Sequence, residues 1–256
     1  MADFEPTGET GVPGSEAQPM NFVQRLGGVF FEPQKTFEDI NRKPSWLGIF
    51  LIVCALALAS MYVLQTRMDH ETYMRKALRM SSFTRNLPEE QIQKIVTQPQ
   101  GAFQRYSQWV FAPVGVLVAY LITAGVFLLV FVLLGAAITF KKSLAISVWG
   151  MAPPGIIMTL LGILFMYVKD PETLDLNPAG NIASNLGMLV SSKEHPAISS
   201  LLSSLDLFSF WTIFLLATGY VAISNRKLTM GKSVAAIVAM WAIWVLGKAG
   251  FSALWG

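Results

Sequence analysis

Gly231-Lys232-Ser233 is the pattern in this sequence that most resembles a nucleotide-binding motif. The same residue types end the phosphate-binding loop, in which backbone amides and a lysine bind the phosphates of a nucleotide. That loop also requires a glycine five residues before Gly231, whereas position 226 is Arg, and it follows a strand, which is not expected here. We therefore interpret the pattern as a basic membrane turn with a helix cap.

Glu89-Glu90 followed by Lys94 resembles the paired glutamates of some intramembrane proteases, with Lys where those enzymes have Arg. The pair lies in a polar stretch outside the apolar segments. Acids are favoured in the first turn of a helix, and a Glu and a Lys four residues apart can form an ion pair. These two effects explain the pattern without a catalytic site.

The two histidines, His70 and His195, are the strongest candidate metal ligands. A zinc site needs three or four convergent ligands. Asp69 and Glu71 flank His70, but adjacent residues of a helix point in different directions. We predict no metal site, no cofactor site and no catalytic residues.

Ionisable residues are absent from the interiors of five long apolar stretches, and Asp206 and Lys248 lie only at their edges. Ion and proton carriers place such residues inside the membrane. Coupled transport by this chain alone is therefore disfavoured. An intramembrane enzyme is disfavoured too, because no nucleophile and base lie at compatible depths.

The composition indicates a membrane protein. Apolar residues make up 53% of the 256 residues and charged residues 14%, against roughly 25% charged in an average soluble protein. The net charge is only +3, and the basic residues lie in clusters beside apolar stretches, which argues against nucleic-acid binding. The single cysteine, Cys54, excludes an intramolecular disulfide.

Apolar length predicts an all-α polytopic membrane protein with a five-helix transmembrane bundle. A crossing needs about 20 apolar helical residues. Pro113 is expected to mark the start of the second span, and Pro153 and Pro154 are expected to kink the third. Within a membrane domain at 46–256, the spans are predicted at about 46–64, 113–138, 144–168, 207–224 and 233–251.

The segments before the first span are predicted to be a disordered acidic tail at 1–20 and an interfacial amphipathic segment at 21–45. Thr36 followed by Asp39 resembles a capping box with Asp in place of Glu or Gln. Lys43 and Trp46 are at positions expected for membrane anchors. Phe22, Leu26, Val29 and Phe30 recur at helical spacing.

Two long connections join the spans. The connection at 169–206 is predicted to be mostly loop, whereas 65–108 is predicted to contain two amphipathic helices, the second opening at Pro88. The first helix has an apolar face with Tyr73, Ala77 and Met80. Beside that face lies a candidate interaction surface for anionic lipid or another protein. The alternative is that this helical pair folds over the chain's own spans. The candidate surface comprises Arg75, Lys76, Arg79 and Arg85.

Short basic loops report orientation more reliably than long loops. Two tight turns, around Lys141-Lys142 and at 225–232, contain basic residues and no acid. Placing both turns inside puts nine of the 19 basic residues in the cytoplasm, and seven of the others lie in the single loop 65–108. We predict a cytoplasmic N-terminus.

Several short motifs resemble those of bacterial members of the Ypt-interacting protein (YIP) family, whose eukaryotic relatives bind Rab-type GTPases. The resemblance extends from about Phe22 to the end of the chain. The motifs are Phe31-Glu32-Pro33, Thr36-Phe37, Ile40, Lys43-Pro44-Ser45-Trp46, Thr139-Phe140-Lys141, Ala152-Pro153-Pro154 and Ser204-Leu205-Asp206-Leu207-Phe208-Ser209-Phe210-Trp211.

The resemblance implies five spans, a cytoplasmic N-terminus and a role in organising other membrane proteins. GTPase binding is not carried over, because the Asp-Leu-Tyr-Gly-Pro stretch of the eukaryotic proteins is missing before the first span. The resulting hypothesis is a non-enzymatic scaffold or accessory protein of the bacterial inner (cytoplasmic) membrane. Its expected partners are the lipid bilayer and other membrane proteins, including transporters, or further copies of itself; the alternative is a subunit of a transporter or channel.

Overall fold

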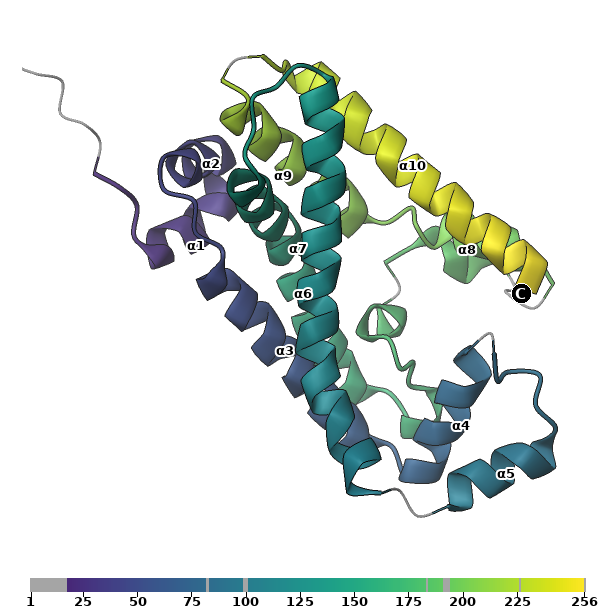
Figure 1. The fold of residues 1–256 in the computed structure, drawn as a ribbon. Coiled ribbons are helices and arrows are strands. Elements are labelled where there is room, and N and C mark those ends of the chain that lie inside the picture. The colour runs from purple at the N-terminus through teal and green to yellow at the C-terminus, as the bar shows by residue number, and fades with distance from the viewer. Residues whose placement is uncertain are drawn as a thin grey trace, which may run out of the picture.

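Helices make up nearly all of the regular structure in the computed structural model (Figure 1). The structure describes residues 18–81, 83–98, 101–182, 184–190, 194–225 and 227–255, so most of the predicted acidic tail lies outside the described residues. The described β structure consists of one isolated bridge between Asn185 and Asp206. The all-α prediction is therefore confirmed.

Four of the described helices are long and apolar enough to cross a membrane. They are α3 (Leu47–Arg67), α6 (Ala102–Leu133), α7 (Phe140–Val168) and α10 (Met230–Trp255). The remaining predicted span corresponds to α9 (Leu207–Ile223), which is apolar but has only 17 residues.

Helix α6 differs from the predicted span 113–138 at both ends. It begins at Ala102 and passes through Pro113, because one lost backbone hydrogen bond does not end a long transmembrane helix. It ends at Leu133, where Gly135 adopts a left-handed φ of 86°. The Gly135 and Ala136 amides donate to the carbonyls of Val132 and Phe131, which is the Schellman arrangement.

Helix α7 is the central element, and it packs against α3, α6 and α9. Most residues of its first half are buried. The helix continues through Pro153 and Pro154, so neither proline ends it. The kink expected at these prolines stays a prediction.

Two glycines allow α7 and α9 to approach closely. A Cβ atom at Gly150 would lie 2.8 Å from Leu216 Cδ2, and one at Gly219 would lie 2.5 Å from Ile146 Cγ2. Small residues at such contacts let helix backbones pack tightly in a membrane. The Tyr220 hydroxyl is hydrogen-bonded to Oγ of Ser143 at 2.7 Å and Oγ of Ser147 at 3.0 Å.

The segment predicted to be interfacial folds into two helices, α1 (Phe22–Phe31) and α2 (Pro33–Arg42). Helix α2 packs against α9 and α7, with Phe37 and Ile40 fully buried. Its apolar residues therefore serve the chain's own core. Contact between this segment and the bilayer surface stays a prediction.

The predicted capping box at Thr36 and Asp39 is wrong, because both residues lie inside α2. The Thr36 hydroxyl donates to the Glu32 carbonyl instead. The capping box of this region is formed by Asn21 and Gln24 at the start of α1. Both pairs have the same three-residue spacing. Which pair caps a helix depends on where the helices begin, and α2 begins at Pro33, before Thr36.

Asp39 is instead part of a buried ion pair that joins α1 to α2. Arg25 Nε donates to Asp39 Oδ2 at 2.7 Å, and Arg25 Nη1 donates to Ser45 Oγ at 2.6 Å. Beside it, Trp149 Nε1 donates to the Ser45 carbonyl at 2.7 Å. The predicted anchor Trp46 is half-buried against the core, whereas Lys43 is exposed.

The connection at 169–206 contains more helix than predicted. It includes η1 (Pro171–Thr173), η2 (Pro178–Asn181), η3 (Leu186–Leu189) and α8 (Pro196–Leu202). Helix α8 lies against the C-terminal half of α10 (Figure 1). These elements are short, so their periodicity is too weak to read from sequence.

The close α7–α9 contact leads to a test with a matched control. Gly150→Ala is expected to destabilise the fold by about 1–3 kcal/mol, because the added methyl group overlaps Leu216. Gly155→Ala on the same helix meets no atom within 4 Å and is expected to be neutral or slightly stabilising. Thermal unfolding in detergent, followed by circular dichroism, measures both. Equal melting temperatures for the two variants would contradict the contact.

Candidate interaction surface

The loop between α3 and α6 folds into a hairpin of two helices, α4 (His70–Met80) and α5 (Glu89–Thr97), as the sequence predicted. The Asp69 side chain caps α4 by accepting from the Thr72 amide at 2.9 Å. Ile92 and Val96 of α5 are buried. Tyr73 of α4 packs against a second apolar cluster at the ends of α3 and α7.

Ion pairs between the two helices stabilise the hairpin. Arg75 and Arg79 of α4 both bind Glu89 of α5, Arg79 at 2.7 Å, and Arg75 also binds Glu71 of its own helix at 2.9 Å. The described ion pairs do not include Glu90 with Lys94, and Glu89 pairs across the hairpin with α4 rather than along its own helix. Hydrogen bonds from Arg75 and then Arg79 lower the pKa of Glu89.

The turn between the helices is also held by Arg79. Its Nη1 atom donates to the carbonyls of Arg85 at 2.6 Å and Leu87 at 3.3 Å. The Thr84 hydroxyl donates to the Leu78 carbonyl at 2.7 Å. The turn therefore has a defined conformation, although it lies at the surface.

Two basic side chains bind α7 and the segment that follows it, Lys76 from the hairpin and Arg67 from α3. Lys76 Nζ donates to the carbonyls of Glu172 and Leu174 at 2.6 and 2.7 Å. Arg67, at the end of α3, donates to the carbonyls of Met166 and Lys169 at 3.2 and 3.3 Å. The last carbonyls of a helix lack partners within the helix and favour a positive charge.

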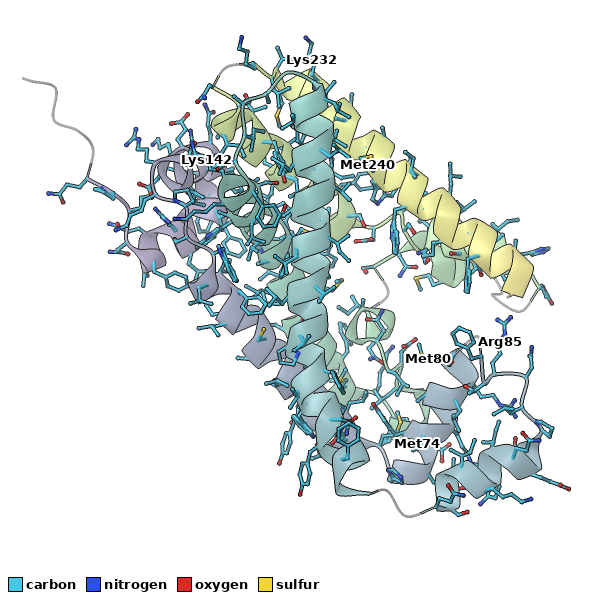
Figure 2. All side chains as sticks on the ribbon, in the orientation of Figure 1. Met74, Met80, Arg85, Lys142, Lys232 and Met240 are labelled. Carbon is cyan, nitrogen blue, oxygen red and sulfur yellow. The ribbon has the colours of Figure 1, made fainter. Side chains whose placement is uncertain are left out.

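The four basic residues of the predicted surface are thus divided by their contacts. Arg75, Lys76 and Arg79 make structural contacts within the protein. Arg85 lies half-exposed at the turn, where Figure 2 places it near Met80. Phe83 in the same turn is 95% exposed, and Met80 is exposed rather than on a buried face. The surface presented outward is therefore a turn with two large apolar side chains and one arginine.

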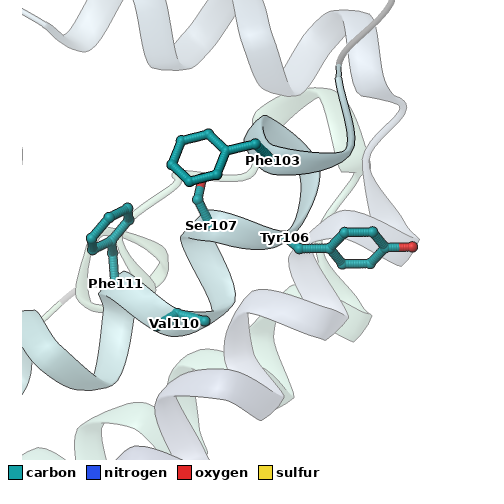
Figure 3. A pocket seen from close by; sticks show the side chains of 5 residues that line it. All are labelled: Phe103, Tyr106, Ser107, Val110 and Phe111. Carbon is teal, nitrogen blue, oxygen red and sulfur yellow. The ribbon is translucent and has the colours of Figure 1, made fainter.

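A shallow apolar hollow lies on the first turns of α6. Figure 3 shows its lining side chains, Phe103, Tyr106, Ser107, Val110 and Phe111, which all come from one helix. The aromatic rings lie where α6 leaves the hairpin and enters its most apolar stretch. Aromatic side chains are typical of the boundary between water and lipid.

The other candidates from the sequence lie apart from this surface. Lys232 and Ser233 are in the first turn of α10, where the Lys232 amide donates to the Thr229 hydroxyl at 3.3 Å. The buried Ser233 hydroxyl donates to the Ala217 carbonyl of α9 at 3.1 Å. Figure 2 shows Lys232 and Lys142 at the opposite end of the molecule from Arg85. Within the described chain, no group of three or more His, Cys, Asp or Glu lies positioned to hold a metal.

Sequence reasoning missed the structural role of Arg67, which attaches α3 to the end of α7. The available signal was an arginine directly at the end of the first apolar stretch, where a basic side chain can reach unpaired helix carbonyls. The sequence did not indicate which helix would supply those carbonyls.

Four long apolar helices define the chain as a multi-pass helical membrane protein. The Yip1 domain family model matches residues 27–253, and the chain belongs to this family, as its motifs indicated. It is similar to Membrane protein YknW of Bacillus subtilis (strain 168), with 26% identity over 194 residues, which cover 76% of each chain. No solved structure matches the chain.

The contact of α5 with α4 is expected to weaken in acid. Because the folded-state pKa of Glu89 is lowered, its contribution to stability is present above the ordinary glutamate value of about 4.3 and is lost as the pH falls through the lowered value. Amide hydrogen exchange in α5, corrected for the intrinsic rate, should show protection falling in this range. Glu89→Gln should remove the step, and Glu90→Gln should retain it. The same pH profile in all three proteins would contradict this assignment.

Proposed function

We propose that this YIP-family protein is a non-enzymatic membrane accessory protein that organises other membrane proteins through the outer face of α10. The observation that carries the proposal is the sparse packing of this helix. Only 17% of the most apolar stretch of α10 is buried within the chain. Among the described helices, α10 packs extensively only against α8 and α9. Helices in a membrane associate through such available faces.

The face itself has the composition of a protein-binding surface. Ile243, Trp244 and Leu246 are all more than half exposed, and Trp244 reaches 71%. Tryptophan is enriched where protein partners contribute most of their binding energy. The proposed partner is another integral membrane protein, for which a transporter is a suitable class, or a second copy of this chain.

The turn of the α4–α5 hairpin supplies a second contact in this proposal. Arg85 and Phe83 project from a turn whose backbone is already bound by Arg79 and Thr84. A preorganised turn loses little conformational entropy on binding. Arg85→Glu therefore tests the partner contact, whereas Arg75→Ala tests the folding of the hairpin.

The proposal includes α9 as a fifth span. Helix α7 ends beside the α4–α5 hairpin, whereas α10 begins at the opposite end, so α9 lies where a return through the membrane is required (Figure 1). At 1.5 Å per residue, its 17 residues extend about 26 Å, slightly less than the hydrocarbon core. Five spans place the N-terminal helices and the C-terminus on opposite sides of the cytoplasmic membrane.

Impermeant thiol labelling in intact cells tests the orientation. In a Cys54→Ser background, cysteines replacing Lys141 and Lys227 should be shielded, because these residues lie in the basic turns expected in the cytoplasm. Cysteines replacing Glu90 and Thr97 in α5 should react. All four positions are exposed, so accessibility within the protein does not bias the comparison. The reverse labelling pattern would overturn the cytoplasmic N-terminus.

Co-purification in mild detergent, quantified by mass spectrometry, tests the accessory role. Combined Ile243→Ala, Trp244→Ala and Leu246→Ala should reduce recovery of the partner by about tenfold or more, as expected when an interface loses a large central side chain. Leu47→Ala with Leu51→Ala on α3 provides the control, because these exposed leucines belong to another helix. If both variants recover every partner equally, the α10 face faces only lipid and the proposed function fails.

A further inference from the structure

The connection before α9 presents large apolar side chains outward. Leu189 is 74% exposed and Met188 is 64% exposed, although neither lies in a predicted span. Leu186 and Ile198 are about half exposed. We call Leu186, Met188, Leu189 and Ile198 the η3–α8 surface.

The protein holds this surface in a defined position. A Cβ atom at Gly187 would lie 2.8 Å from Ser203 Cβ, so the backbone of η3 packs directly against the chain leading to α9. The Asn185 side chain accepts from the Gly187 amide at 3.0 Å, and Asn185 forms a β-bridge with Asp206. The exposure of the apolar side chains is thus a feature of an ordered segment.

Polar contacts lie on the inner side of the same segment. Lys248 of α10 donates to Ser204 Oγ at 2.7 Å and to Ser203 Oγ at 3.3 Å. The Ser252 hydroxyl donates to the Pro196 carbonyl at 3.2 Å. These contacts fix α8 to the end of α10, and η3 is held through its packing against Ser203, so hydrogen-bonding groups are turned toward the protein.

The η3–α8 surface continues the apolar surface of the membrane helices. Leu207 and Phe210 on the first turns of α9 and Phe251 near the end of α10 are also more than half exposed. Figure 1 shows α8 alongside the C-terminal half of α10. The segment connects two apolar helices, α7 and α9, so it lies close to the bilayer surface in the proposed topology. Helix α9 alone is shorter than the hydrocarbon core.

We propose that η3 and α8 lie in the headgroup region of the bilayer and insert the η3–α8 surface at the boundary with the acyl chains. Such segments bind lipid through an apolar face directed into the membrane and a polar side directed away from it. Here the anchor fixes the depth of the short helix α9 and of the C-terminal end of α10. The part concerning α9 rests on its proposed role as a fifth span.

Nitroxide labels in reconstituted vesicles test the depth of this surface. Single cysteines replacing Met188 and Leu189, in a background without Cys54, are labelled and their collisions with oxygen and a water-soluble nickel chelate are compared. Glu90 on α5 provides the aqueous reference, and the exposed Val118 on α6 provides the lipid reference. A label at Phe214 reports separately whether α9 is in the bilayer. The oxygen-to-nickel ratio at 188 and 189 should be several-fold higher than at 90 and lower than at 118.

Each outcome decides one question. Nickel accessibility at 188 and 189 equal to that at 90 would overturn the lipid anchor, even if Phe214 reports a buried α9. Dipolar broadening at 188 and 189 that disappears on dilution with unlabelled protein would also overturn it, because the surface would then contact a second copy. An aqueous signal at Phe214 with lipid contact at 188 and 189 would leave the anchor standing and reject the fifth span.

Discussion

The close packing of α7 against α9 is the contact on which the rest of the bundle depends. In lipid, helices gain little from burying apolar surface, so association relies on van der Waals contact and hydrogen bonds. Gly150 and Gly219 permit this contact, and the Tyr220 hydroxyl adds hydrogen bonds within it. Helices α3 and α6 then pack on α7, α10 packs on α9, and α2 covers both central helices.

The two ends of the bundle use charge differently. At the end that carries α1 and α2, Arg25 is buried with Asp39 and stabilises the junction between the two helices. At the other end, Arg67 and Lys76 bind helix and loop carbonyls, and Arg75 and Arg79 bind Glu89 of the neighbouring helix. Three basic side chains of the α4–α5 hairpin, Arg75, Lys76 and Arg79, therefore maintain its shape, and the turn is the part for which we propose a role in recognition.

The described structure presents several exposed apolar surfaces on which the proposed function depends. The outer face of α10, the hairpin turn and the η3–α8 surface are separate regions of exposed apolar residues. Each one is supported from behind by hydrogen bonds or close packing within the chain. In the proposed function, this support would hold neighbouring helices and lipid in fixed positions.

The sequence by itself determined the helical class, the positions of the apolar helices and the two helices of the α4–α5 hairpin. These features follow from local properties, namely apolar length and the spacing of apolar residues along a helix. Tertiary structure alone decided that Asp39 pairs with Arg25 rather than capping a helix, and that Glu89 pairs with α4. It also decided that Lys76 binds the segment after α7. The physical reason is that these partners are distant in the chain, and a side chain's role depends on which groups the folded backbone brings within hydrogen-bonding distance.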